Sequence, residues 1–154
     1  MKKIICVMCA FVMIFLSVVP AFSAAENEIV LAENGKTDYK IIVSENAADA
    51  EKNAAKILAD YLKKISSAQF EIITDGADAS EKEIVIGVTN RDGEITIDRA
   101  EYGDDGVRIL TSGEKLFLTG GMKSGAIYAV YTFLEDWLGC RWFTNELEVV
   151  PEAD

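Results

Sequence analysis

Apolar residues recur at spacings of three and four residues in two segments, and each segment predicts an amphipathic helix. The first helix is expected from about Ala47 to Ser66, with Asn46 as its N-cap. Its apolar stripe contains Ala50, Ala54, Ile57, Leu58, Tyr61, Leu62 and Ile65. The second helix is expected from about Ser124 to Leu138, with a stripe of Ile127, Val130, Tyr131, Leu134, Trp137 and Leu138. Gly139 follows it, where a left-handed residue commonly closes a helix.

Short runs rich in β-branched residues predict strands around these helices. Two such runs flank Asn34-Gly35, so the stretch from Asn27 to Glu45 predicts a hairpin. The runs FEIIT (70–74) and EIVIGVT (83–89) predict strands of mostly buried character. A second hairpin is expected over 106–121, with its turn at Ser112-Gly113. The polar connection from Asn90 to Asp105 is expected to be exposed, with a weak strand at Glu94 to Ile97.

This order of elements predicts one α/β domain, an α+β sandwich. Each predicted helix has a single apolar stripe to bury, and the predicted strands are too apolar to be bare on both faces. We therefore expect a mixed β-sheet with both helices packed on one face.

The N-terminus has the layout of a secretory signal peptide. Lys2 and Lys3 precede an apolar run from Ile4 to Val19, and Pro20 and small residues follow it. The run is short for a membrane span, so a retained anchor is the weaker alternative. We take residues 1–25 as a cleaved signal and 26–154 as the mature domain, which predicts a secreted or extracytoplasmic protein with no stable membrane anchor.

Removal of this leader changes the charge and the sulfur content. The chain has 15 Lys and Arg residues and 26 Asp and Glu residues, and the leader contains two of the lysines, so the mature net charge is about −13. Such acidity disfavours nucleic acid and anionic membranes as partners. Two of the three cysteines also lie in the leader, which leaves Cys140 alone and excludes an intramolecular disulfide.

The residues offer little for catalysis. The chain has no histidine, which excludes Ser-His-Asp and Cys-His chemistry and the usual zinc sites. Cys140 is therefore expected to be buried, not nucleophilic, and GGMKSG (120–125) is expected to form a tight strand-to-helix turn instead of an anion site. The acidic pairs Asp104-Asp105 and Glu135-Asp136 are sequence neighbours whose side chains point in different directions. No catalytic, metal or cofactor-binding residue is predicted.

Three residues lie beyond the predicted end of the second helix and outside its stripe: Arg141, Trp142 and Phe143. They could pack under this domain, contact a following domain, or stack against a sugar ring. We select them as the candidate inter-domain contact.

The segment from Gly103 to Asp154 resembles the end of an N-terminal accessory domain of bacterial exported glycoside hydrolases, as found in β-N-acetylhexosaminidases and α-glucuronidases. The motif runs from GVRI (106–109) in one strand, through an apolar strand ending in Gly120-Gly121, to GAIYAVYTFLEDWLGCRWF (125–143), with Pro151 after it. The helix AAKILADYLKKIS (54–66) and the strand EIVIGVT occur in the expected order, so the resemblance covers about residues 27 to 154.

This resemblance implies an α/β sandwich that precedes a (β/α)₈ barrel, which holds the catalytic carboxylates. The chain is then expected to be a non-catalytic part of a longer protein, with the downstream catalytic domain as its partner and a polysaccharide or glycan as a further candidate. A stand-alone secreted carbohydrate-binding or interaction module is the alternative, and an exposed planar aromatic cluster would favour it. A complete small hydrolase is the weakest hypothesis, because histidine and a carboxylate pair are missing.

Overall fold

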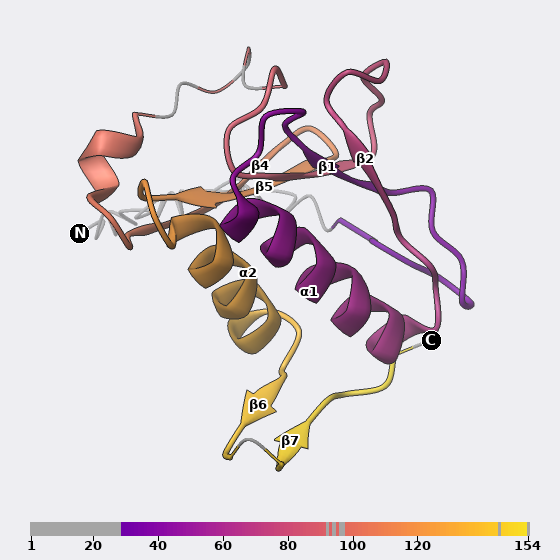
Figure 1. Cartoon of the computed structure of the whole chain (residues 1–154). Helices are drawn as coiled ribbons and strands as arrows, with labels where there is room; N and C mark the ends of the chain where they lie inside the picture. Colours follow the sequence, from indigo (N-terminus) through magenta and orange to yellow (C-terminus); the bar gives the residue numbers. More distant parts are fainter. Residues whose placement is uncertain (1–28, 92, 94, 96–97, 145, 154) are drawn as a thin grey trace, which may run out of the picture.

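The computed structural model describes residues 29–91, 93, 95, 98–144 and 146–153, and it contains the predicted mixed sheet. Five strands pair in the order β2-β1-β3-β5-β4 (Figure 1). Their bounds are β1 Lys40–Val43, β2 Glu71–Thr74, β3 Glu83–Ile86, β4 Val107–Ser112 and β5 Lys115–Gly120. The first four strands in this order are mutually parallel, and β4 runs antiparallel to β5. The signal-peptide prediction for 1–25 lies outside the described residues, as does most of the weak strand expected at Glu94 to Ile97.

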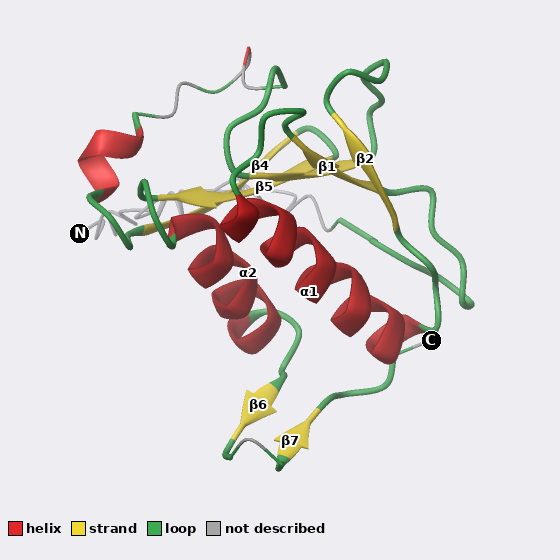
Figure 2. Cartoon of the chain, viewed as in Figure 1, coloured by secondary structure: helices red, strands yellow, loops and turns green. Residues whose placement is uncertain are grey.

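Both long helices cover the same face of this sheet, as predicted (Figures 1 and 2). The helix α1 (Asp49–Ser66) and the helix α2 (Gly125–Asp136) contact each other and share one core with the sheet. Their buried faces include two alanines each, Ala54 and Ala55 on α1 and Ala126 and Ala129 on α2. Small side chains at these positions let the two helices lie close to each other and to the strands.

The predicted N-cap of α1 is wrong by two residues. Ala48 occupies the cap position, and the Glu51 carboxylate accepts a hydrogen bond from the Ala48 N–H at 3.0 Å. The Glu51 side chain thus replaces a polar N-cap side chain, because it accepts a hydrogen bond from one of the amides that lack a partner within the helix. The C-terminal end is closed by Ser67 in the left-handed conformation (φ 59°), whose N–H donates to the Lys63 carbonyl at 2.9 Å.

The predicted stripe of α2 is only partly correct. The residues buried along the helix are Gly125, Ala126, Ala129, Val130, Phe133 and Leu134, whereas Trp137 is 61% exposed and Tyr131 is also exposed. The helix is apolar almost all round, so more than one stripe fits the 3.6-residue period, and only the position of α1 and the sheet selects between them. The closure at Gly139 is confirmed, with φ +76°.

The predicted N-terminal hairpin is wrong. Residues 29–32 form no strand, and only a single bridge between Glu33 and Lys36 encloses Asn34-Gly35. β1 pairs instead with β2 and β3, since a central position in a parallel sheet uses both of its edges. β2 is not mostly buried as expected, because it lies at the edge of the sheet, where Ile72 is 41% exposed.

The face of the sheet opposite the helices carries a second small core. Ile42, Val85 and Phe117 lie in register on three neighbouring strands and are almost fully buried. Two positions nearer the strand starts, Glu83 and Lys115 form a paired polar row on the same face, with 3.4 Å between Nζ and Oε2. The helix-free face is therefore apolar at its centre and charged at one end.

Candidate functional site

The predicted contact residues lie in a small hairpin outside the main sheet. The strands β6 (Arg141–Trp142) and β7 (Glu148–Val149) pair antiparallel, with Trp142 opposite Glu148. Figure 2 shows this hairpin beyond the C-terminal end of α2, well apart from the five-stranded sheet. The Phe143 N–H donates to the Leu147 carbonyl at 2.9 Å and closes the turn.

The exit from α2 sets the direction of this hairpin. The Cys140 N–H donates to the carbonyl of Leu134, six residues earlier, at 2.9 Å, and Gly139 allows this bond by its positive φ. The Cys140 side chain is fully buried, and this burial raises the pKa of its thiol, as expected for a packing residue and not a nucleophile. The Arg141 guanidinium donates to the carbonyls of Glu135 and Cys140, which ties the start of β6 to the end of the helix.

Trp142 anchors the hairpin to both helices. Its ring meets Tyr61 of α1 and Tyr131 of α2 edge to face, with centroids 5.4 and 5.2 Å apart. Its indole N–H donates to the Tyr61 hydroxyl oxygen at 2.7 Å. Trp142 is half-buried and therefore belongs in part to the core of this domain.

Glu148 makes the second attachment on the opposite strand. Its carboxylate accepts a hydrogen bond from the Tyr61 hydroxyl and an ion-paired one from Lys64 Nζ at 2.7 Å. The Lys64 ammonium lowers the pKa of Glu148, and the same pairing raises the pKa of Lys64. Tyr61 thus bonds both strands of the hairpin. We call Tyr61, Lys64, Tyr131, Trp142 and Glu148 the clasp.

The clasp leaves an apolar surface on the hairpin itself. Phe143 is 64% exposed, and Leu147 and Val149 are at least half exposed as well. Of the three predicted contact residues, Phe143 therefore faces outward, while Arg141 and Trp142 make bonds within the domain. We call Phe143, Leu147 and Val149 the hairpin surface. An anchored element that exposes large apolar side chains is typical of an interface.

The carboxyl ends of the parallel strands, where α/β folds often bind ligands, are filled by the protein's own groups. The Arg99 guanidinium donates to the carbonyls of Gly120 and Gly121 at 3.1 and 3.0 Å and to the Glu51 carboxylate at 3.2 Å. Arg99 lies in a short 3₁₀ helix (Arg99–Tyr102) and holds that loop over the strand ends.

GGMKSG forms the predicted tight strand-to-helix turn, and its amides already have acceptors. The amides of Gly121, Met122, Lys123 and Ser124 donate to backbone carbonyls of residues 103–106, which occupy the place an anion would need. A Cβ at Gly120 would lie 2.0 Å from the Gly106 carbonyl oxygen, so the glycine permits this close approach. The glycine spacing in the motif thus serves packing.

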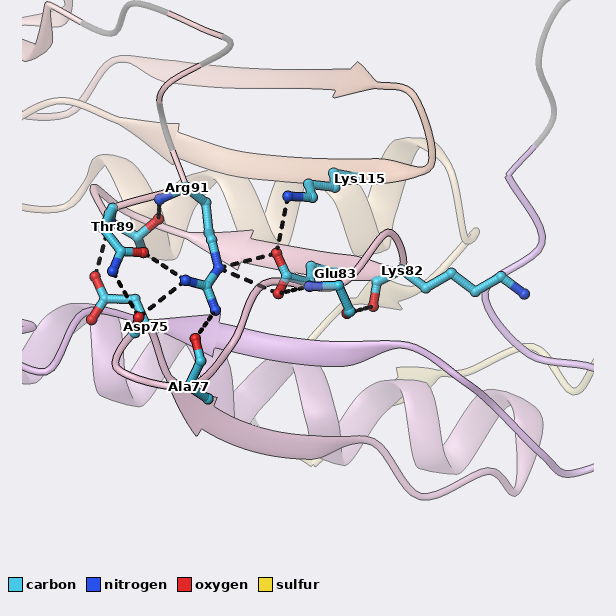
Figure 3. A network of polar contacts seen from close by, with 9 residues as sticks. Asp75, Ala77, Lys82, Glu83, Thr89, Arg91 and Lys115 are labelled. Carbon is cyan, nitrogen blue, oxygen red and sulfur yellow. Dashed lines mark hydrogen bonds and ion pairs between the residues drawn. The ribbon is translucent and has the colours of Figure 1, made fainter.

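The connection after β3 was predicted to be exposed, and this is wrong for Arg91. Its side chain is buried on the helix-free face (Figure 3). Its Nε lies 3.2 Å from the Glu83 carboxylate, and its Nη atoms donate to the carbonyls of Asp75 and Ala77. The Asp75 carboxylate in turn accepts from the amides of Glu45 and Asn90. A buried charge needs such partners, and here they join three loops.

The described ranges contain no group of three or more His, Cys, Asp or Glu side chains arranged to hold a metal ion. None of the helices in the described part of the chain is both long enough and apolar enough to cross a membrane. No protein-family model and no curated protein matches the chain.

Sequence reasoning missed Tyr61 as a polar anchor, together with Lys64 and Glu148. Tyr61 was assigned only to an apolar stripe, and Glu148 lies 87 residues from it along the chain. The sequence around each residue gives no sign of this contact, because a tyrosine in a helix and a glutamate in a strand are both common.

Proposed function

We propose that this chain is a non-catalytic N-terminal accessory domain of an exported carbohydrate-degrading glycoside hydrolase, which supports a downstream (β/α)₈ catalytic barrel. The observation that carries the proposal is the hairpin surface, which is apolar and exposed, yet is held by the clasp on both helices. Such a surface can orient a neighbouring domain, because its position is fixed before contact.

Two further features support this reading. The domain has the sandwich architecture that the resemblance implies, with the motif glycines at the β5–α2 turn and at the end of α2. Three buried carboxylates make hydrogen bonds or ion pairs to other groups of the protein: Glu51, Asp75 and Glu83. Their oxygens are therefore engaged in holding the fold. A glycosidase needs two carboxyl groups free to flank one bond.

A stand-alone carbohydrate-binding module is the second candidate, because aromatic rings are exposed on the surface. Within the clasp, however, Trp142 meets Tyr61 at 77° and Tyr131 at 83°, so these rings form no shared plane on which a sugar could stack.

The test starts with the reading frame beyond Asp154 and the protein it encodes. We expect a barrel domain there, and Phe143→Ser should lower the thermal midpoint of the longer protein while leaving the domain of residues 26–154 almost unchanged. Ile72→Ser is the matched control, since Ile72 is also exposed but lies on β2, away from the hairpin. If both substitutions lower the thermal midpoint of the longer protein equally, the hairpin surface is not the interface.

The alternative module makes a different prediction. The mature domain alone should then bind soluble glycans in calorimetric titration, and it should do so without any downstream sequence. Our proposal expects no such binding and no turnover of aryl N-acetylglucosaminides or aryl glucuronides. Turnover abolished by substituting one carboxylate of this chain would overturn it.

A further inference from the structure

The segment before β1 contains the only Asn-Gly pair of the chain, and this pair lies in an exposed turn. Asn34 has φ 51° and Gly35 has φ 71°, as in the tight type I′ turn that Asn-Gly favours. Glycine has no side chain to shield its backbone nitrogen, so that nitrogen can readily attack the side chain of a preceding asparagine. The residues that follow the other asparagines are all larger: Glu28, Ala47, Ala54, Arg91 and Glu146.

Few bonds hold this turn closed. The Glu33 N–H donates to the Lys36 carbonyl at 2.9 Å, and the Lys36 N–H donates to the Glu33 carbonyl at 3.0 Å. Beyond this bridge the Thr37 hydroxyl donates to the Leu31 carbonyl, but no described strand extends the pairing. The five-stranded sheet contains neither arm of the turn, so the turn can open while the core stays folded.

The two groups that would react are free. Neither the Asn34 side-chain amide nor the Gly35 N–H has a hydrogen-bond partner among the described residues. Both residues are exposed, so water and a solvent base can reach them. A Cβ at Gly35 would meet only the Ser66 carbonyl oxygen, at 4.0 Å, so the turn is not packed tightly against α1.

Two Asp-Gly pairs, which can form the same cyclic intermediate, are protected by the fold. In Asp75-Gly76 the aspartate is buried, and its carboxylate accepts hydrogen bonds from two backbone amides. In Asp105-Gly106 the glycine N–H donates to the Tyr102 carbonyl at 2.9 Å. The structure therefore engages the reacting groups of these two pairs and leaves those of Asn34-Gly35 unprotected.

We propose that Asn34 is a site of spontaneous deamidation in the folded protein, with water as the co-reactant. The Gly35 backbone nitrogen gives its proton to a solvent base and attacks Cγ of Asn34. The bond from Cγ to the side-chain nitrogen breaks, and ammonia leaves behind a five-membered succinimide. Water then opens this ring at one of its two carbonyls and leaves aspartate or isoaspartate. One amide and one water thus become one carboxylic acid and one ammonia.

The product changes the turn in two ways. It adds one negative charge next to Glu33 on a protein that is already acidic. Isoaspartate also adds a methylene group to the main chain, which misaligns the bridge between Glu33 and Lys36. This modification is independent of the proposed function, since it requires only the residues before β1.

Peptide mapping by mass spectrometry measures the reaction in the purified mature protein. The protein is incubated at mildly alkaline pH, either folded or unfolded in guanidinium chloride. We expect the folded protein to lose ammonia at Asn34 at a rate within several-fold of the unfolded chain. Asn46 is the matched control, because it is exposed but precedes Ala47, and it should stay intact over the same period. Asn34→Gln should abolish the acidic species that forms on ion exchange.

Two further substitutions separate local opening from global unfolding. Thr37→Val removes the hydroxyl bond to Leu31 and should raise the rate in the folded protein toward that of the unfolded chain. Gly120→Ala places a Cβ against backbone atoms at the β5–α2 turn and weakens the domain as a whole. It should leave the rate at Asn34 unchanged.

Three results would overturn the inference. If the turn opened only together with the whole domain, the folded protein would react roughly a thousandfold or more slowly than the unfolded chain. A rate that rises with Gly120→Ala and not with Thr37→Val would have the same meaning. An Asn34 that stays as intact as Asn46 would show that the turn protects it.

Discussion

Replacing Trp142 by alanine tests whether the hairpin belongs to this domain. The substitution removes two edge-to-face aromatic contacts, worth about 0.5–1.5 kcal/mol each, from Tyr61 and Tyr131. It also removes the indole N–H bond to Tyr61, worth about 0.5–1.5 kcal/mol. Because Trp142 is only half-buried, we expect Trp142→Ala to lower the free energy of unfolding of the mature domain by about 2 to 3 kcal/mol, below the roughly 3–5 kcal/mol of a fully buried tryptophan.

Urea denaturation followed by circular dichroism measures this loss. Phe143→Ala is the matched control in the same hairpin, and it should cost less than about 0.5 kcal/mol because that ring is exposed. A double-mutant cycle with Trp142→Phe and Tyr61→Phe should give a coupling of about 0.5–1.5 kcal/mol for the direct hydrogen bond. Equal losses for Trp142→Ala and Phe143→Ala would refute the clasp. A loss at the upper end of the core range would instead show that Trp142 is no inter-domain residue.

Three other perturbations probe the rest of the fold. Arg91→Met should lower the free energy of unfolding by about 3–5 kcal/mol, because it leaves buried carboxylate oxygens without their partner. Arg108→Met, on the surface, should cost little. Similar losses for the two variants in urea denaturation would contradict this. The lowered pKa of Glu148 stabilises the fold above the pKa of the unfolded chain, and this contribution is lost as pH falls through the folded pKa. The stability difference between Glu148→Gln and the native protein should therefore shrink from pH 7 to pH 3, and a constant difference would exclude the pairing. Gly120→Ala should cost about 1–3 kcal/mol in thermal unfolding because its Cβ meets backbone, whereas Gly93→Ala meets nothing within 4 Å and should be close to neutral; a neutral Gly120→Ala would refute the close approach.

The filled strand ends bear on how the domain could act. In many α/β proteins the carboxyl edge of a parallel sheet is open to ligands. Here Arg99 and Glu51 close it, and loop carbonyls take the amides at the start of α2. The exposed apolar side chains lie instead on the hairpin and near the C-terminal ends of the two helices. Exposed apolar surface is typical of regions that contact another protein domain.

The sequence singled out Arg141, Trp142 and Phe143 as candidate contact residues but not which of them faces outward. Arg141, Trp142 and Phe143 stood out because they follow a helix cap and continue an aromatic run. Which of them turns inward depends on the two-residue strand β6, whose pairing with β7 directs Trp142 toward Tyr61 and leaves Phe143 in the turn. In a strand of two residues, the alternation of side chains does not show which residue faces inward. The position of the helices decides this.

Local pattern alone determined the two helices, most of the strands, the closure at Gly139 and the turn at Gly120-Gly121, because each depends on residues a few positions apart. The packing of both helices on one face was also predicted correctly, although the stripe expected for α2 was only partly right. Only tertiary structure decided which face of α2 is buried, since an almost wholly apolar helix fits several orientations. The same holds for the buried Arg91 and for the strand partners of β1. Contacts between residues far apart in the chain leave no periodic signal, so the burial of a charge or the choice of a neighbouring strand is fixed only when the whole core assembles.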